Sequence, residues 1–234
     1  TGQAALPAAV PQLCIDQLAL TDGPAVNEQS AETAVILYTS GSTGQPKGVR
    51  LPHSALHSYV QTAVAHFRLT ARDKVLQFAS IGFDTSLEEL SPAHLAGATL
   101  VLRTDDSLSS VQTFFAFCQE HQITVLDLPT AFWHTLAIEM RRDANLHLPA
   151  SVHTLIIGGE RAAPEHLATW QQVAPAHVTL WNTYGPTETT IVAVACPIAG
   201  PSAVAQAALA PIGRPVASAR VTVVDQYDQL APIG

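Results

Sequence analysis

The sequence predicts an α/β protein with a mainly parallel sheet flanked by helices. Short runs of β-branched and aliphatic residues alternate with amphipathic segments, which is the pattern of parallel strands connected through helices. With 234 residues and 47% hydrophobic content, the chain is long enough to bury a substantial core. Its longest apolar runs are far shorter than the roughly 20 residues of a membrane-spanning helix.

Each expected element follows from its local pattern. Strands are expected where short apolar runs are bounded by polar or turn-forming residues: Val35–Thr39, Val75–Phe78, Thr99–Leu102, Thr124–Leu128, Thr154–Ile157, Val178–Trp181, Ile191–Ala195 and Val221–Val224. Helices are expected in four segments between them: Leu56–Phe67, Ser109–His121, Thr130–Met140 and Pro164–Ala174. The apolar faces of the first two, including Tyr59, are expected to pack in the core.

Composition divides the chain into three regions. Residues 1–30 carry scattered proline, glycine and aspartate and are interpreted as a connector or a remnant of a preceding region. Residues 31–196 hold the expected α/β core with its binding sites. Residues 197–234 begin with a stretch rich in alanine, proline and glycine, so we expect a loop and then the truncated start of a β-rich subdomain. Because the chain begins at Thr1 and ends just after an expected strand, we interpret it as a partial domain.

Charge and cysteine usage argue against several classes of partner. A formal net charge of −8 and a pI near 5.6 disfavour nucleic acid and anionic membranes, which attract basic surfaces. Cys14, Cys118 and Cys196 are far apart and form no CxxC pair, so neither a zinc site nor a disulfide framework is predicted. The chain opens with no charged-then-apolar leader, and a reducing, cytoplasmic location is expected.

The stretch YTSGSTGQPKG (38–48) overlaps the end of the expected strand Val35–Thr39 and continues as a loop. Loops at the carboxyl ends of strands bind ligands in open α/β sheets, and glycines let backbone N–H groups turn toward an anion. The spacing is not that of a Walker P-loop, because Pro46 and Gly48 stand where that motif requires glycine and a hydroxyl residue. Hydroxyl donors and one positive charge nevertheless suit a polyphosphate: Ser40, Ser42, Thr43 and Lys47. An ordinary polar connecting loop is the alternative.

Three further polar stretches follow expected strands: FDTSLEEL (83–90), GGE (158–160) and NTYGPTETT (182–190). Each has an ordinary explanation. The first has the spacing of a helix start with a capping box between Ser86 and Glu89, and the other two have the composition of turns. All four stretches nevertheless fall at strand-to-loop junctions. We therefore expect them together on one edge of the sheet, where they would form a binding site.

These stretches resemble motifs of the adenylate-forming enzyme superfamily, and within it the adenylation domains of nonribosomal peptide synthetases. LYTSGSTGQPKGV looks like the phosphate loop of that family, FDTS like its substrate-entry motif, and NTYGPTE like its adenine and magnesium motif, in the family's order. The resemblance covers nearly the whole chain. It implies the core fold of adenylate-forming enzymes, with this chain as a central fragment of the large N-terminal core domain.

The resemblance also implies roles for individual residues. The phosphate loop would cover the β- and γ-phosphates of ATP with Thr39, Ser40, Gly41, Ser42, Thr43, Gly44 and Lys47. The rest of the nucleotide pocket would consist of Gly159, Glu160, Asn182, Tyr184, Gly185 and Thr187. Within it, Asn182 and Tyr184 would hold adenine, and Thr187 would approach the α-phosphate. Glu188 would bind Mg²⁺, and the catalytic residues would be Thr43, Lys47, Thr187 and Glu188.

The implied reaction is ATP-dependent activation of an amino acid, in which an aminoacyl-adenylate forms and pyrophosphate leaves. The acyl group would then pass to the phosphopantetheine of a peptidyl carrier domain in a neighbouring synthetase module. The family's ribose-binding aspartate, hinge and mobile-domain lysine have no counterpart before Gly234, so we expect the isolated fragment to be poorly active. Two alternatives stay open: an acyl- or aryl-CoA ligase of the same superfamily, and a catalytically incomplete nucleotide-binding core.

Asp84 matches the aspartate that pairs with the substrate's α-ammonium in peptide-synthetase adenylation domains, which favours an α-amino acid. The side-chain pocket is implied to be lined by Thr85, Glu88, Asp127, Ile156, Gly158, Thr183, Ile191 and Val192. Because buried carboxylates without a cation are unfavourable, Glu88 and Asp127 predict a basic substrate, with arginine first and lysine or ornithine next. The alternative is that Glu88 is a helix-start acid and Asp127 a strand-end cap.

Overall fold

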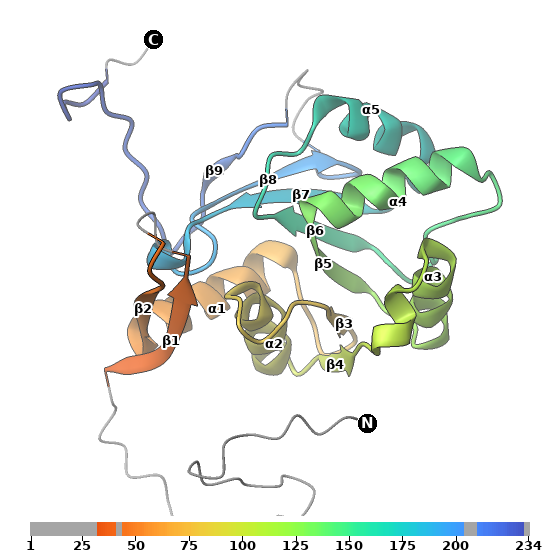
Figure 1. The fold of residues 1–234 in the computed structure, drawn as a ribbon, viewed down its shortest axis with the longest axis horizontal. Helices are drawn as coiled ribbons and strands as arrows, with labels where there is room; N and C mark the ends of the chain where they lie inside the picture. The colour runs from red at the N-terminus through yellow and green to blue at the C-terminus, as the bar shows by residue number, and fades with distance from the viewer. Residues whose placement is uncertain (1–31, 41–43, 204–209, 232–234) are drawn as a thin grey trace, which may run out of the picture. The chain divides into compact units, whose positions relative to one another are not determined.

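The computed structural model describes residues 32–40, 44–203 and 210–231. Its main feature is a seven-stranded sheet with helices on both faces, beside which a separate two-stranded hairpin lies (Figure 1). The predicted α/β fold with a mainly parallel sheet is confirmed. Among the described residues, no helix combines the length and apolar character needed to span a membrane.

The large sheet has the strand order β4-β3-β5-β6-β7-β8-β9. Neighbouring strands from β4 to β7 run parallel, whereas β8 and β9 are antiparallel to their neighbours. The strands are β3 (Lys74–Gln77), β4 (Thr99–Leu102), β5 (Val125–Pro129), β6 (Thr154–Gly158), β7 (Thr179–Tyr184), β8 (Val194–Ala199) and β9 (Arg214–Pro215). The carboxyl ends of β5, β6 and β7 therefore meet at one edge of the sheet.

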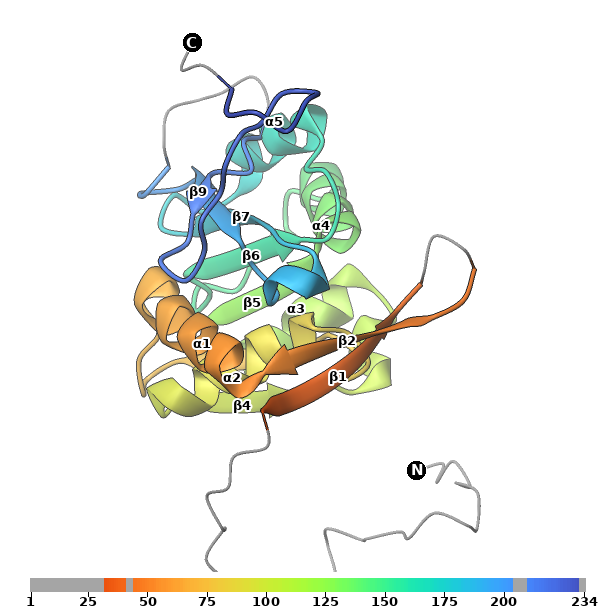
Figure 2. The same ribbon diagram turned by 90° about the vertical axis from the view of Figure 1, so that its left-hand side faces the viewer.

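A different set of helices covers each face of this sheet (Figure 2). On one face, α1 (His53–Phe67) and α2 (Thr85–Ala96) pack in a cluster of buried residues with side chains of the strands. The larger core on the other face is built from α3 (Val111–Glu120), α4 (Thr130–Arg142) and α5 (Pro164–Val173). All four predicted helices are present, with ends that differ from the prediction by three residues or fewer.

Strand β5 shows how side-chain alternation divides the two cores. Leu126 and Leu128 are buried in the cluster with α3, α4 and α5, whereas Val125 is buried in the cluster with α1 and α2. Successive side chains of a strand point to opposite faces, so Asp127 shares the face of Val125. The one carboxylate in an otherwise apolar strand thus faces α1 and α2.

Three strand predictions are corrected by the structure. The strand at Val35–Thr39 is not part of the large sheet, because β1 (Thr33–Thr39) pairs antiparallel with β2 (Lys47–Pro52). Val221–Val224 forms no strand, only an isolated bridge between Val224 and Leu230. The strand expected at Ile191–Ala195 begins at Val194. The sequence did not predict β2, which contains glycine and proline, or β9, which has two residues and ends in proline.

The predicted division into three regions stays a prediction. Region 1–30 lies outside the described residues. The composition change near residue 197 falls inside β8, which pairs with β7 on one side and β9 on the other. A separate subdomain beyond this point stays a prediction.

Hydrogen bonds of Asp73 connect the amino ends of β3, β5 and β6, at the edge of the sheet opposite the polar loops. Its carboxylate accepts hydrogen bonds from the Thr70 backbone N–H at 2.8 Å and from the hydroxyl of Thr124, just before β5, at 2.8 Å. The Nε2 atom of His153, just before β6, lies 2.9 Å from the same carboxylate. Although burial opposes the shift, the hydrogen bonds from Thr124 and Thr70 lower the pKa of Asp73.

Replacing Asp73 with asparagine tests this arrangement. Asp73→Asn should lower the free energy of unfolding by about 1–3 kcal/mol at pH 7, because buried hydrogen-bond donors lose a charged acceptor. A lowered carboxyl pKa stabilises the fold above the ordinary aspartate pKa, and this contribution is lost as pH falls. Urea unfolding should therefore show the two proteins converging below about pH 4. Asp106→Asn, at an exposed site, is the control, and a deficit of equal size at every pH would contradict the argument.

Candidate active site

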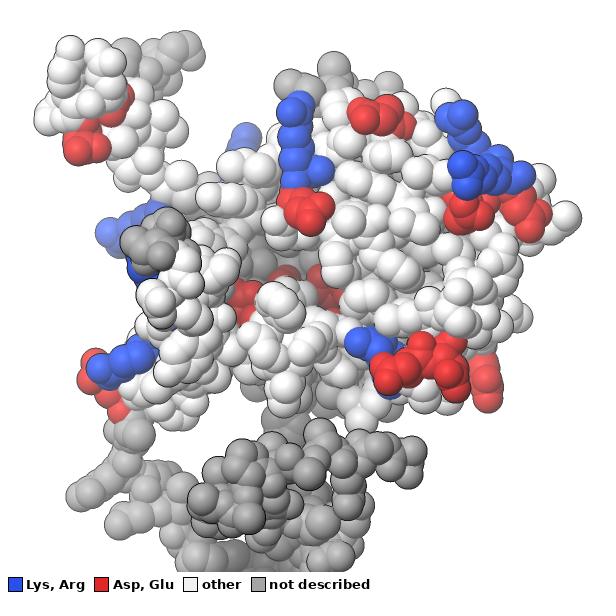
Figure 3. Space-filling model, in the orientation of Figure 1, with Lys and Arg blue, Asp and Glu red and all other residues white. Residues whose placement is uncertain are grey.

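A cavity of about 490 Å³ opens at the carboxyl ends of β5, β6 and β7. Its other wall comes from the segment between β3 and α2 and from the first turn of α2. Figure 3 shows acidic atoms at the bottom of a hollow in this face of the molecule. The cavity is lined by Phe78, Ala79, Ser80, Phe83, Asp84, Thr85, Glu88, Arg103, Asp127, Leu128, Pro129, Gly158, Gly159, Glu160, Thr183, Gly185, Ile191 and Val192.

Close backbone approach shapes the floor of the cavity. A Cβ atom on Gly158 would lie 2.6 Å from Thr183 Oγ1, so only glycine leaves room there for the threonine side chain. The Thr183 hydroxyl in turn donates a hydrogen bond of 3.0 Å to the Ile157 carbonyl oxygen. A Cβ atom on Gly185 would lie 2.3 Å from the Ile191 carbonyl oxygen, so glycine also lets the chain after β7 fold back.

Glu89 holds the wall between β3 and α2. Its buried carboxylate accepts hydrogen bonds from the backbone N–H groups of Phe78 and Ala79, both at 2.9 Å. The alternative interpretation of Ser86 and Glu89 as a capping box does not hold, since the Ser86 hydroxyl donates to the Phe83 carbonyl oxygen instead. Burial raises the pKa of Glu89 to about 7, against the opposing effect of these hydrogen bonds.

Two of the predicted motifs are joined directly. The Thr187 hydroxyl, on the short 3-10 helix η3 (Thr187–Thr189), donates a hydrogen bond of 2.7 Å to the Asp84 carboxylate at the start of α2. These residues are 103 positions apart in the sequence. The contact brings the substrate-entry motif and the adenine motif together on one side of the cavity.

Glu88 and Asp127 place two carboxyl groups in the cavity wall with almost no exposure. They are 8% and 4% exposed, and Glu88 Oε1 and Asp127 Oδ2 find no hydrogen-bond partner among the described residues beyond each other and Tyr59. Neither forms an ion pair with a described residue. Burial raises the pKa of Glu88 to about 8, and burial together with the charge of Glu88 raises that of Asp127. The alternative roles of a helix-start acid and a strand-end cap explain neither the burial nor the missing partners.

The structure brings most of the predicted substrate residues together. Asp84 and seven of the eight pocket residues line the cavity: Thr85, Glu88, Asp127, Gly158, Thr183, Ile191 and Val192. Ile156 does not line it and is buried in the core with α1 and α2.

The predicted nucleotide residues are more scattered. Gly159, Glu160 and Gly185 line the cavity. Asn182 is buried and its side-chain amide donates a hydrogen bond of 2.9 Å to the Pro211 carbonyl oxygen, so this group already has a protein partner. Tyr184, at the end of β7, is 54% exposed beside the cavity edge residue Gly185.

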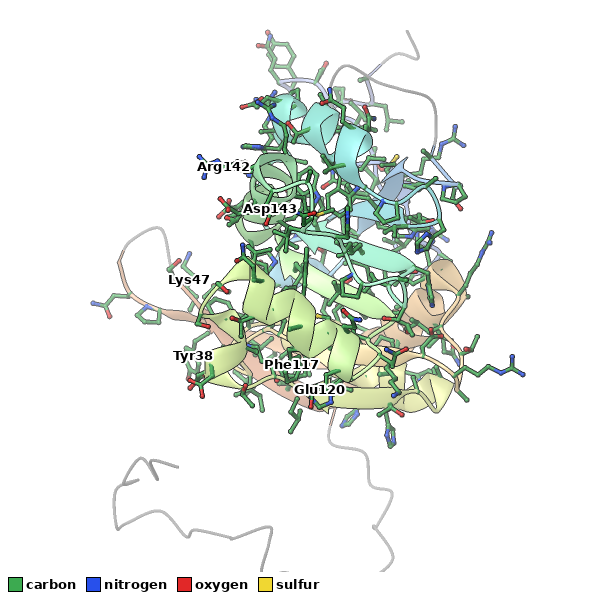
Figure 4. The ribbon with its side chains drawn as sticks, turned by 90° about the vertical axis from the view of Figure 1, so that its right-hand side faces the viewer. Tyr38, Lys47, Phe117, Glu120, Arg142 and Asp143 are labelled. Carbon is green, nitrogen blue, oxygen red and sulfur yellow. The ribbon has the colours of Figure 1, made fainter. Side chains whose placement is uncertain are left out.

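The predicted phosphate loop lies on the hairpin and not on the large sheet. The expectation that all four motifs follow strands of one sheet is therefore wrong for this loop, because β1 pairs only with β2. Thr39 pairs with Lys47 where the hairpin opens into the loop, and Figure 4 shows Lys47 near this end. Strand β2 contacts η3, which brings the hairpin to the adenine motif. Ser40 and Gly44 are exposed, whereas Gly41, Ser42 and Thr43 lie outside the described residues.

Glu188 fits the predicted magnesium site in part. It is an exposed carboxylate on η3, and Mg²⁺ is typically held by one or two carboxylates together with phosphate oxygens. Within the described ranges, no group of three or more histidine, cysteine or acidic residues could hold a metal by itself. Glu188 would therefore bind Mg²⁺ only together with the phosphates of a nucleotide.

Sequence reasoning missed several residues at this site, among them Arg103 and Tyr59, which bear on its charge and hydrogen bonding. Arg103, just after β4, lines the cavity, and its Nε donates a hydrogen bond of 2.8 Å to the Phe78 carbonyl oxygen. Arg103 directly follows an expected parallel strand, so its position in the sequence could have been used to predict that it lies at the same edge of the sheet. Tyr59 is buried as predicted, but its hydroxyl is among the unpartnered oxygens near Glu88. Helical periodicity gave no sign of that contact.

Comparison with known proteins gives one family. The model of the AMP-binding enzyme family matches residues 3–234. The chain is 46% identical over 194 residues to the isonitrile lipopeptide synthase of Streptomyces coeruleorubidus, covering 83% of this chain and 13% of that protein. It is 35% identical over 225 residues to bacitracin synthase 1 of Bacillus licheniformis, covering 95% of this chain and 4% of that protein. The chain thus spans a small part of these curated relatives.

Solved structures share the fold. The N-terminal subdomain of Klebsiella oxytoca NpsA, in complex with 3-hydroxybenzoyl-AMSN, superposes with a TM-score of 0.76 at 24% identity, covering 94% of this chain and 54% of that one. The Vibrio cholerae adenylation domain AlmE, in complex with glycyl-adenosine-5'-phosphate, gives a TM-score of 0.72 at 26% identity. That match covers 88% of this chain and 38% of AlmE.

The raised pKa of Glu88 predicts a pH-dependent stability. A carboxyl group whose folded pKa is about 8 favours folding below its ordinary pKa of about 4.5, and this contribution is lost as pH rises through 8. In urea unfolding, wild-type stability should fall from pH 6 to pH 8 by up to about 1.4 kcal/mol per pH unit from this group. The free energy of unfolding of Glu88→Gln should decrease less than that of wild type over the same pH range. Glu120→Gln, on the exposed end of α3 (Figure 4), should behave as wild type. Parallel pH curves for wild type and Glu88→Gln would disprove the shift.

Proposed function

Because the chain belongs to the AMP-binding enzyme family, we propose that it activates an amino acid as its adenylate. Its relatives are adenylation domains of nonribosomal peptide synthetases, and the chain corresponds to the N-terminal part of their core. The proposed reaction is attack of the substrate carboxylate on the α-phosphorus of ATP. An aminoacyl-adenylate forms and pyrophosphate leaves, so no covalent protein nucleophile is needed.

The residues around the cavity have the chemistry that this reaction requires. Asp84 supplies a negative charge for the α-ammonium of the substrate, and its hydrogen bond to Thr187 fixes the carboxylate beside the proposed α-phosphate position. Lys47 and the hydroxyl-rich loop would bind the departing pyrophosphate. Gly159, Glu160 and Gly185 would border the nucleotide, with the exposed ring of Tyr184 free to stack on adenine.

Magnesium, held by Glu188 and the phosphates, would neutralise phosphate charge in the transition state. The proposed acceptor of the activated acyl group is the phosphopantetheine of a carrier domain in a neighbouring module, and the proposed location is the cytoplasm. A CoA ligase for acyl or aryl acids is less consistent with Asp84, since such substrates carry no α-ammonium.

The substrate is proposed to carry a cationic side chain, with arginine preferred over lysine and ornithine. One observation carries this proposal: Glu88 and Asp127 place buried, unpaired carboxyl groups in the cavity wall. An isolated buried charge is strongly unfavourable, and a cation from the substrate would supply the missing partner. Arg103 does not fill this role, because its guanidinium is bound to the Phe78 carbonyl and to Asp105 at 3.2 Å. A guanidinium suits two carboxylates because its donors form a fixed fork.

ATP–pyrophosphate exchange by the full-length protein, run across the amino acids and ornithine, tests the substrate class. Arginine should give the highest kcat/KM. Glu88→Gln and Asp127→Asn should each lower it about a hundredfold or more, since breaking a buried ion pair costs about 3–5 kcal/mol. Glu120→Gln should leave it unchanged. A preference for leucine or phenylalanine would contradict the cationic substrate, and exchange with aryl or fatty acids would support the CoA-ligase alternative.

The variant Lys47→Ala tests whether the phosphate loop affects the rate of adenylation without affecting the choice of substrate. Removing this charge should slow adenylation of every substrate about equally, by about tenfold to a thousandfold, because Lys47 lies on the hairpin and does not line the cavity. The measurement is exchange kinetics with arginine, lysine and ornithine. A changed order of preference among the three would show that the loop has been assigned the wrong role.

A further inference from the structure

Three buried oxygen atoms without hydrogen-bond partners outside their own group lie close together at the cavity wall. They are Tyr59 Oη on α1, Glu88 Oε1 on α2 and Asp127 Oδ2 on β5. Their side chains are 2%, 8% and 4% exposed. No described residue outside this group of three is hydrogen-bonded to these atoms. They lie close enough together for Tyr59 to hydrogen-bond Glu88, and burial first, then the charge of the two carboxyl groups, raises the pKa of Tyr59.

Such a cluster is unusual for a folded core. Buried polar groups nearly always find partners, and each that does not costs about 1–3 kcal/mol. Here the three come from separate elements and the two carboxyl groups also line the cavity. Other buried polar atoms without partners, on His66, Trp133, Ser151 and Trp170, do not belong to residues that line the cavity, whereas Glu88 and Asp127 do, which points to a ligand that completes their hydrogen bonding.

Burial first, and then the surrounding charges, raise the pKa values of the pair and favour its protonation. Asp84 and Glu89, in and beside the first turns of α2, add negative charge and favour a proton on Glu88. The Tyr59 hydroxyl opposes this by favouring the ionised form of Glu88. Arg103 also lines the cavity, but it is bound to Asp105 and neutralises neither carboxyl group. Glu160 also lines the cavity, but it is an acidic residue and cannot act as a counter-ion to the two carboxyl groups. Two carboxyl groups in one buried site cannot both ionise readily without a cation.

We propose that Tyr59, Glu88 and Asp127 form a cation subsite that releases a proton when the side-chain cation of the substrate enters. This inference rests on the proposed function. In the free protein the acid pair shares a proton. On binding, that proton leaves to the solvent and the substrate's positive charge takes its place, so the net charge of the subsite is unchanged. Tyr59 is the positioning residue, since its O–H can donate to Glu88 and hold it ionised against the cation.

Exchange kinetics of the full-length protein with arginine and citrulline test the proposal. Citrulline has nearly the shape of arginine but a neutral side chain, so the ratio of the two kcat/KM values cancels pH effects on ATP, the α-ammonium and the protein at large. For wild type this ratio should rise at least about tenfold from pH 6 to pH 8 and level off above about pH 8. A ratio independent of pH would overturn proton exchange.

Tyr59→Phe removes only the hydroxyl. It should raise the KM for arginine several-fold at pH 7 with little change in kcat, and the defect should disappear near pH 9, because loss of the donor makes Glu88 harder to ionise. Tyr227→Phe, at an exposed tyrosine far along the chain, is the matched control. A defect that persists at every pH would show a merely structural role and overturn the assignment of Tyr59.

The outcomes separate the inference from the proposed function. If arginine, lysine and ornithine are not activated, the substrate class is wrong and the inference falls with it. If arginine is activated but its advantage over citrulline does not change with pH, only the inference fails. Should Tyr59→Phe not fold, Glu88→Gln takes its place, and in that variant the ratio should be smaller and rise less with pH than in wild type, because only the buried Asp127 is left to exchange its proton. A ratio that rises in Glu88→Gln as steeply as in wild type would overturn the proposal.

Discussion

Burial of the large sheet between two layers of helices governs where the polar residues of this protein can lie. Because β3, β5, β6 and β7 run parallel and are covered on both faces, their carboxyl ends meet at one edge, and their connecting loops must lie there. Gly158 at the end of β6 and Gly185 just after β7 let neighbouring side chain and backbone atoms approach closely at this edge, where a Cβ atom would clash. The cavity is therefore a consequence of the sheet, and the polar residues around it are arranged by strand order.

Asp127 shows what this burial does to a single residue. Its neighbours in β5 are Val125, Leu126 and Leu128, all buried, so a carboxylate in this strand has no path to solvent except through the cavity. The strand places it on the face of α1 and α2, where Glu88 and Tyr59 are also buried. An apolar residue at this position would pack as well as its neighbours do. A carboxyl group there makes the cavity selective for a polar or charged ligand and lowers the stability of the fold.

The β1–β2 hairpin shows that a sequence motif can predict a phosphate-binding loop while its position in the fold is predicted wrongly. The glycine and hydroxyl residues after β1 predict a phosphate loop, but the strand before it was assigned to the parallel sheet. Strand pairing depends on contacts between distant segments, and the β1–β2 hairpin packs on α1 and η3 and not beside another strand of the sheet. Likewise, the spacing of Ser86 and Glu89 fits a capping box, but tertiary contacts with Phe78 and Ala79 hold the Glu89 carboxylate instead.

Local patterns in the sequence were enough to predict the α/β class, the positions of four helices and of the parallel strands, and most of the residues that line the cavity. These features follow from periodicity, turn chemistry and motifs that are contiguous in the chain. Only the tertiary structure shows that the hairpin is a separate sheet and that Tyr59 lies beside Glu88 and Asp127. It also shows the hydrogen bonds from Thr187 to Asp84 and from Asn182 to the Pro211 carbonyl oxygen. Each of these depends on contacts between elements tens of residues apart, and a local pattern carries no information about the partner that folding brings to a side chain.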